Sequence, residues 1–241
     1  MTELLFRADP YLRDCDARVV AVNDRGGVIL DRTVFYATAG GQPGDAGTLE
    51  VGGLGALPIA TTVYDDGKQV VHVVEGGGSS SLPEPGAEAR AALDWERRYR
   101  HMRAHTALHL LCALVKFPVT GGQIAADGGR LDFDIADPSA VSREVLESEI
   151  NRLIAEDHPV AEQWISDEDL AANPGLVRTM SVKPPTGSGR VRLVAIGEGG
   201  GIDLQPCGGT HVRRTGEIGR VTVAKPESKG RQNRRIRLNL A

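Results

Sequence analysis

Two short segments that lie far apart in the sequence hold the side chains best suited to chemistry. His105 and His109 stand four residues apart in the stretch RRYRHMRAHTALHLL, so a helix would place both imidazoles on one face. Cys207 and His211 stand at the ends of CGGTH, where two glycines allow the backbone to turn tightly. Two ligands from a helix and two from a turn make a tetrahedral nitrogen and sulfur set, which suits Zn²⁺ best.

Other interpretations of this region stay open. A histidine pair or a Cys–His pair alone is a weak indication of a metal, and the combination is what favours a site. His101 and Cys112 lie on nearly the same stripe of the helix, so the ligand set could differ. We expect Cys112 to be a buried core thiol, because free cysteine usually behaves as a small hydrophobe. We expect His101 on the surface or on the substrate side.

The ligand set leaves the role of the metal open, because four protein ligands would close a structural site and catalysis needs an open position. Zinc peptidases carry a glutamate directly after the first histidine as general base, and here that position is Thr106. A reaction would therefore depend on the metal to lower the pKa of its water or to polarise a carbonyl. This chemistry fits a reactive ester better than an amide.

The histidine helix should follow a β-rich segment. Short apolar or alternating runs at 17–23, 27–31, 60–64, 70–74 and 87–94 are separated by turn signals, which predicts a small β-barrel domain over residues 1–94. Residues 34–47 are too rich in glycine for a regular element. This loop could bring bare backbone N–H groups against a ligand, or it could be a plain hairpin connection. Residues 75–86 are expected to form a flexible connection.

Residues 95–241 combine helices with alternating strands. Phe117-Pro118 should end the histidine helix, and residues 120–123 (TGGQ) read as a second glycine-rich turn. An amphipathic helix is expected at 142–157 with Ser142 as its N-cap, and a short one at 167–172. Strands are expected at 130–135, 160–165, 191–196, 219–224 and 236–240. The predicted fold class is therefore α+β, an N-terminal barrel followed by a core with an antiparallel sheet and helices.

Composition limits the class of protein. The chain has 241 residues, of which 41% are hydrophobic, so it should be globular. Three cysteines argue against a disulfide framework and for a reducing compartment. The acidic N-terminus does not resemble a signal peptide, and no apolar run approaches the length of a membrane span. We therefore expect a cytoplasmic protein that does not bind membranes.

The basic residues gather around both candidate ligand segments. Residues 205–241 carry a net charge of +7, whereas residues 1–204 carry −11. A second cluster, Arg97, Arg98, Arg100 and Arg103, leads into the histidine helix. Either cluster alone could be a solvated charged face. Their convergence on one site favours a polyanionic substrate.

At this point the sequence resembles a known family. RAHTALHLL followed far downstream by QPCGGTHV is similar to the editing module of alanyl-tRNA synthetases, and more similar still to the free-standing alanyl-tRNA editing proteins of the AlaX group. AGGQPGDAG at 39–47, GGQ at 121–123, TGEIG at 215–219 and KGRQNRR at 229–235 also resemble motifs of that family. The resemblance covers most of the chain and matches the medium-length, two-domain members.

The resemblance implies hydrolysis of the ester in tRNA(Ala) mischarged with serine or, in some members, glycine, with Zn²⁺ held by the four ligands. It implies that Gln123 lies in or near the aminoacyl pocket, and we expect Gln123 and Thr106 to take part in catalysis. Substrate-binding residues are expected to be Gly40, Gly41, Gln42, Arg103, Arg234 and Arg235.

Two positions depart from the synthetase pattern. Leu108 and Ala126 replace the threonine and serine that are common there, and each change removes a hydroxyl that could contact a seryl group or water. The choice of substrate is therefore less defined than the type of reaction. The alternative hypotheses are a tRNA-binding module with a structural zinc, and a zinc peptidase or amidase, which the missing glutamate disfavours.

Overall fold

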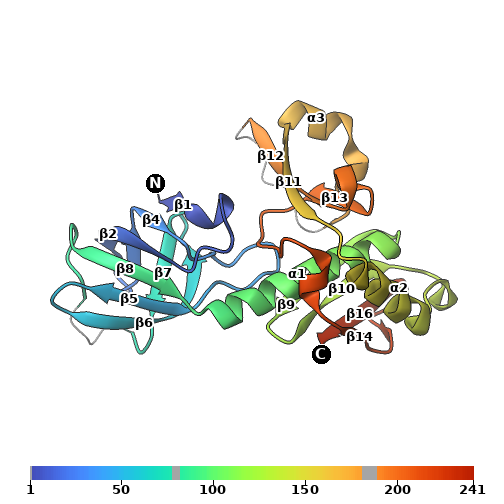
Figure 1. Ribbon diagram of the computed structural model, residues 1–241, viewed down its shortest axis with the longest axis horizontal. Helices are drawn as coiled ribbons and strands as arrows, with labels where there is room; N and C mark the ends of the chain where they lie inside the picture. Colours follow the sequence, from blue (N-terminus) through green and yellow to red (C-terminus); the bar gives the residue numbers. More distant parts are fainter. Residues whose placement is uncertain (1, 78–81, 181–188) are drawn as a thin grey trace. The chain divides into compact units, whose positions relative to one another are not determined.

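The computed structural model describes residues 2–77, 82–180 and 189–241, so part of the predicted connection at 75–86 lies outside the described residues. The chain divides into two compact units, Met1–Tyr99 and Arg100–Ala241. The prediction of a mixed α and β protein with an N-terminal barrel is confirmed (Figure 1). Among the described residues, no helix has the length and apolar character needed to cross a membrane.

The first unit is built on a closed six-stranded barrel in the order β2-β3-β7-β6-β5-β8. Side chains alternate between the interior and the solvent, as in β8, where Ala89, Ala91 and Leu93 are buried and their neighbours are more exposed. Phe35, Leu30 and Leu49 are among the core residues. The strands of this unit are β1 (Glu3–Leu4), β2 (Asp14–Val22), β3 (Val28–Leu30), β4 (Arg32–Thr33), β5 (Gly47–Val51), β6 (Gly55–Tyr64), β7 (Val70–Val74) and β8 (Glu88–Leu93).

Of the hairpin formed by β5 and β6, only residues 60–64 of β6 were predicted from the sequence. Glycines at both ends of the turn, together with Pro58 inside β6, obscure the alternation that marks these strands. The two strands nevertheless pair in regular antiparallel register from Gly47–Ile59 to Val51–Gly55. They complete a barrel that the other strands alone would leave open.

The glycine-rich segment between β4 and β5 is a loop, as predicted, and it is tightly fixed within its unit. Asp45 accepts hydrogen bonds from the Tyr36 backbone N–H at 2.6 Å and from Nε and Nη2 on one edge of the Arg98 guanidinium. At the tip, Gly40 and Gly41 have φ of 56° and 84°, a conformation that costs glycine little. Both glycines are exposed, whereas the side chain of Gln42 is buried.

The helix α1 (Trp95–Leu114) begins in the first unit and continues into the second. Asp94 caps its start by accepting the Arg97 N–H at 3.1 Å. It ends before Phe117-Pro118, as expected. Leu108 packs against the sheet where Gly129 leaves space, since a Cβ at that glycine would come within 2.8 Å of the leucine side chain.

The described residues of the second unit form two antiparallel sheets and two further helices (Figure 1). The first sheet has the order β14-β16-β10-β9, with β15 added to β16, and the second has the order β11-β12-β13. The strands are β9 (Val119–Ala125), β10 (Gly128–Asp134), β11 (Val160–Ser166), β12 (Arg190–Ile196), β13 (Asp203–Pro206), β14 (Val221–Val223), β15 (Glu227–Ser228) and β16 (Asn233–Leu240), and the helices are α2 (Arg143–Ala155) and α3 (Asp167–Ala172).

One detail of the predicted core is wrong. The predicted turn at residues 120–123 lies inside β9, because its glycines allow neighbouring side chains such as Leu131 to pack closely on the strand. The predicted amphipathic helix is α2, whose buried residues are Leu146, Ile150, Leu153 and Ile154. Leu146 is buried and Val145 is 59% exposed, so the buried stripe follows the i, i+4, i+7, i+8 spacing of a helix. Ser142 caps this helix as predicted.

Candidate metal centre

The structure brings the two chemically promising segments together in the second unit. The ligand-capable atoms of His105, His109, Cys207 and His211 all lie within 4.8 Å of one another. The Cys207 Sγ lies 3.5 Å from His105 Nε2 and 3.3 Å from His211 Nε2. The histidines come from one face of α1 and from the turn after β13, and all four side chains are buried or half-buried. One thiol and three imidazoles thus converge on a single point.

His109 is oriented by a carboxylate from β13. Its Nδ1 lies 2.8 Å from Asp203 Oδ2, and the Gln205 amide donates to the same oxygen at 2.8 Å. A carboxylate can only accept, so His109 donates from Nδ1 and keeps Nε2 available for the cluster. This pairing of a carboxylate with a histidine is the usual support of a metal-binding imidazole.

His211 is oriented by the hydroxyl of Thr106. That hydroxyl donates to the Met102 carbonyl at 2.9 Å, and it lies 3.1 Å from His211 Nδ1 and 3.3 Å from the Val212 backbone N. A hydroxyl has one proton to donate, so His211 Nδ1–H must be the donor to Thr106. His211 therefore also presents Nε2 to the cluster. Thr106 is fully buried.

The cysteine turn is held by its own backbone and by Arg192 of the neighbouring strand β12. Gly209 donates its N–H to Cys207 Sγ at 3.4 Å. The Arg192 guanidinium on β12 donates to the carbonyls of Cys207 and Gly209 at 2.6 and 3.0 Å, and to Glu162 on β11 at 2.6 Å. The turn therefore depends on side-chain and backbone hydrogen bonds. Neither Gly208 nor Gly209 has a positive φ.

The pKa values of the clustered side chains favour the binding of a cation. Burial raises the pKa of the Cys207 thiol, but the adjacent His105 and His211 outweigh burial and hold that pKa well below its usual value. Burial lowers the pKa of His211 well below its usual value. For His109, burial is outweighed by the hydrogen bonds to Asp203 and Cys207, which raise the pKa to about 10. A thiolate beside imidazoles is the donor state that a metal ion requires, and metal binding would displace the remaining proton.

The donor set is therefore suitable for a divalent metal. Nitrogen and sulfur donors in this number are typical of a tetrahedral zinc site, and the second layer of hydrogen bonds fixes the orientation of two of the imidazoles. Asp203 and Gln205 were not singled out from the sequence. Their positions, four and two residues before Cys207, match the alternation of a strand, and this pattern could have identified them.

Two other residues of α1, His101 and Cys112, were open candidates for the ligand set. The expectation that His101 lies on the surface is wrong, because it is 2% exposed and packs inside the fold. Cys112 is 3% exposed, so the prediction of a buried thiol is confirmed, and burial raises the pKa of this thiol. Neither belongs to the cluster of four.

The remaining predicted site residues lie outside the cluster. Gln123 is exposed on β9, where its Oε1 accepts from Arg130 Nε at 3.3 Å. Arg103 donates to the Ile218 carbonyl at 2.7 Å. Arg235 makes two bonds to Asp132, at 2.7 and 2.9 Å, and Arg234 donates to Ser228, Gly230 and Asn233.

Arg98 does not contribute to the basic surface predicted at the start of α1. It is completely buried and paired with Asp45. This guanidinium is therefore unavailable to a polyanion.

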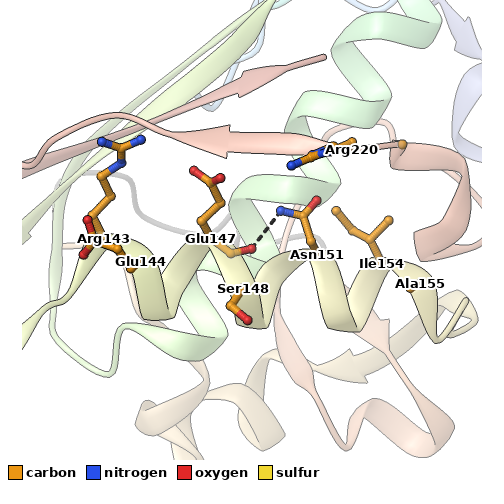
Figure 2. A pocket seen from close by; sticks show the side chains of 9 residues that line it. Arg143, Glu144, Glu147, Ser148, Asn151, Ile154, Ala155 and Arg220 are labelled. Carbon is orange, nitrogen blue, oxygen red and sulfur yellow. Dashed lines mark hydrogen bonds between the residues drawn. The ribbon is translucent and has the colours of Figure 1, made fainter.

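A cavity of about 690 Å³ opens in another part of the second unit, along α2 (Figure 2). Its charged lining is balanced, with two arginines and two glutamates, and Asn151 donates to the Glu147 carbonyl at 2.7 Å. None of the four clustered side chains lines this cavity. The lining residues are Arg143, Glu144, Glu147, Ser148, Asn151, Ile154, Ala155, Gly219 and Arg220.

Two family models match the chain. Residues 191–237, which include Cys207 and His211, match the threonyl and alanyl tRNA synthetase second additional domain. Residues 13–97 match the class II (A) tRNA synthetases. The first match covers β12 to most of β16, and the second covers the barrel.

Individual proteins match over the whole chain. The alanyl-tRNA editing protein AlaX-M of Methanosarcina acetivorans is 35% identical over 247 residues, covering 100% of this chain and 99% of the relative. AlaX-M of Saccharolobus solfataricus is 32% identical, covering 98% of each chain. The alanine–tRNA ligase of Pyrobaculum calidifontis is 35% identical over 94% of this chain, which corresponds to 25% of that ligase.

Proposed function

The chain belongs to the AlaX family of alanyl-tRNA editing proteins, and from this premise we propose that it is a free-standing deacylase that hydrolyses the ester bond of mischarged tRNA(Ala). The observation that carries the proposal is the convergence of three imidazoles and one thiol in the second unit. An enzyme that removes a wrong amino acid needs a group that activates the ester or the attacking water, and this cluster is suited to hold one.

We propose that the group is Zn²⁺, bound by His105, His109, Cys207 and His211. When bound, it would supply Lewis acidity toward the ester carbonyl or the attacking water. The protein's own contribution is positional. Asp203 holds His109 through Nδ1, Thr106 holds His211 through Nδ1, and both rings keep Nε2 directed at the cluster. We therefore assign Thr106 a positioning role, through His211.

The proposed substrate contacts rest on the resemblance to motifs of the alanyl-tRNA editing family and on which of these residues are exposed. Gln123 is exposed and held by Arg130, so its amide is a candidate for contact with the aminoacyl group. The exposed glycines Gly40 and Gly41, with Gln42, are proposed to help sort substrates. Gln42→Ala should then change the preference between Ser-tRNA(Ala) and Ala-tRNA(Ala) more than it changes zinc content. The opposite result would make the loop structural.

The basic residues Arg103, Arg234 and Arg235 are proposed to support tRNA binding, although each also makes hydrogen bonds within the fold. Removing phosphate contacts should lower affinity and flatten its dependence on salt. If the double variant Arg234→Ala, Arg235→Ala binds tRNA as tightly as the parent at every salt concentration, the RNA must bind elsewhere.

The serine ester is the proposed main substrate and the glycine ester a second one. The test is deacylation of Ser-, Gly- and Ala-charged tRNA(Ala), each with and without a chelator. We expect Ser-tRNA(Ala) to be hydrolysed fastest, Ala-tRNA(Ala) to be spared, and the chelator to abolish activity.

Four potential ligands also suit a closed, structural zinc site, so a tRNA-binding module without hydrolytic activity is the alternative. Binding of tRNA with an intact ester in every reaction would favour that alternative and contradict the deacylase.

A further inference from the structure

One face of the sheet β11-β12-β13 carries the supports of the metal centre. Asp203 and Gln205 on β13 pair with Ile196 and Val194 on β12, and residues directly opposite in antiparallel strands share a face. Asp203 bonds His109 of α1, and the Gln205 amide donates to the same oxygen of Asp203. The β13 part of this face is therefore covered by the histidine helix.

The same face continues onto β11. Val194 pairs with Glu162, and Arg192 pairs with Trp164, so Glu162 and Trp164 lie on the side that faces the cluster. Arg192 bridges the strands, because its guanidinium donates both to the Cys207 carbonyl and to Glu162. The row that begins at the cysteine turn thus ends at Trp164. In the described part of the chain β11 pairs only with β12, so this row ends at a sheet edge.

At that edge the indole of Trp164 is open to solvent. The residue is 47% exposed, and the Arg190 guanidinium carbon lies 5.1 Å from the ring centroid. An exposed indole next to a guanidinium is suited to unpaired nucleobases, which stack on aromatic rings and on arginine, while the positive charge attracts phosphate. A surface cation–π pair that only supports the strand is the alternative.

The distance from the cluster fits one end of a nucleic acid. Trp164 and the cysteine turn are separated by two strand spacings, about 10 Å. An aminoacyl ester is attached to the terminal ribose of a tRNA, so an ester at the cluster leaves the last unpaired bases within about that reach. Double-stranded RNA would not present a free base face there.

We propose that Trp164 and Arg190 form a stacking platform for an unpaired base at the 3′ end of the tRNA substrate. This inference rests on the proposed function, since it places the base next to the ester that the cluster acts on. The platform would fix the 3′ end while the remaining contacts hold the duplex. It contributes to substrate binding and leaves the metal ligands untouched.

Fluorescence tests the contact directly. The chain has two tryptophans, so Trp95→Phe leaves Trp164 as the only indole. Uncharged tRNA(Ala) should quench this indole, whereas the same tRNA without its three unpaired 3′ nucleotides should bind without quenching. Equal quenching by both RNAs, or none by either, would overturn the platform. This measurement needs no hydrolysis, so it separates failure of the platform from failure of the proposed function.

Kinetics give the second test. Trp164→Ala should raise KM for the charged tRNA by between about 5-fold and about 100-fold, in keeping with the usual contribution of one stacked base, with zinc content and unfolding midpoint unchanged. Trp164→Tyr keeps a stacking ring and should recover most of the loss. Phe117→Ala, another partly exposed aromatic of the second unit, is the matched control and should behave as the parent. A KM for Trp164→Ala equal to that of the parent, in an enzyme that deacylates, would refute the platform alone.

Discussion

Both units of this protein bury polar side chains, but they do so in different ways. In the barrel unit, Arg98 is matched to Asp45 and to the Val34 and Pro10 carbonyls. His72 is matched there to Thr33 at 2.8 Å and to the Val28 carbonyl at 3.0 Å. In the second unit, three imidazoles and a thiol face one another, and the carboxylate and hydroxyl near them only orient the rings from behind.

The difference separates a structural polar core from a site made for a ligand. Buried polar groups that find protein partners need nothing further. Donor atoms that converge on each other leave a common point which a cation would satisfy. The barrel should therefore depend on its internal pairs for stability, and the cluster should depend on metal for activity. The following changes test this contrast, in order of decreasing expected effect.

The largest effect is expected for Cys207→Ala. Loss of the thiolate removes the sulfur donor, so metal content should fall and deacylation should drop by more than about 100-fold, beyond the effect of losing a supporting residue. Elemental analysis and the deacylation rate measure the two effects. Cys112→Ala is the matched control, since that thiol lies outside the cluster. Full zinc retention by Cys207→Ala would remove this residue from the ligand set.

Arg98→Leu should destabilise the protein strongly while sparing metal content. It leaves the Asp45 carboxylate buried without its partner, and breaking such a pair costs about 3–5 kcal/mol. Urea unfolding followed by circular dichroism gives the free energy, and metal analysis of the folded protein gives the contrast. A loss below about 1 kcal/mol would show that the pair is not a main support of the barrel.

His72 should make stability depend on pH. Burial lowers its pKa from 6.5 to about 4, so the folded state keeps this imidazole neutral while the unfolded state protonates it. The stabilisation is therefore present above about pH 6.5 and is lost as pH falls toward 4, by up to about 3 kcal/mol.

Urea unfolding of the parent and of His72→Gln at pH 7 and pH 4.5 measures the effect. The parent should lose more stability than the variant between these values. Parallel losses in the two proteins would remove His72 as the cause.

Asp203→Asn should have the smallest effect. The variant keeps the shape but weakens the acceptor behind His109, and loss of such a support typically costs 10–100-fold in metal affinity. Competition with a chelator measures zinc affinity directly, independently of activity. Asp134→Asn, an exposed carboxylate of the same unit, is the control. Unchanged affinity would mean that the orientation of His109 does not depend on this bond.

Much of the architecture could be predicted because it follows from local patterns. Alternation predicted most barrel strands, and the Ser142 cap and apolar spacing predicted α2. The pairing of β5 with β6 was missed because glycine and proline hide the alternation. The turn expected around Gln123 was wrong because glycines in β9 allow close packing by side chains of the adjacent strand β10, which the local sequence of β9 does not reveal.

The residues of the candidate site also include some that local spacing reveals and others that only the fold brings together. The four ligand candidates could be found because their spacing carries the chemistry. Arg192 gains its role only when β12 pairs with β13, and Asp203 gains its role only when β13 lies beside α1, so ligand spacing alone does not reveal them. Arg98 appears in the sequence as one of several surface cations, and its burial against Asp45 depends on how the barrel closes.

Whether hydrolysis requires Zn²⁺ bound at the four clustered side chains can be measured by titrating the metal-free protein with Zn²⁺ and following the rate of Ser-tRNA(Ala) deacylation. We expect no hydrolysis without metal and a rate that rises in proportion to zinc until one equivalent is bound per chain. Full deacylation by protein shown to contain no metal would contradict this requirement.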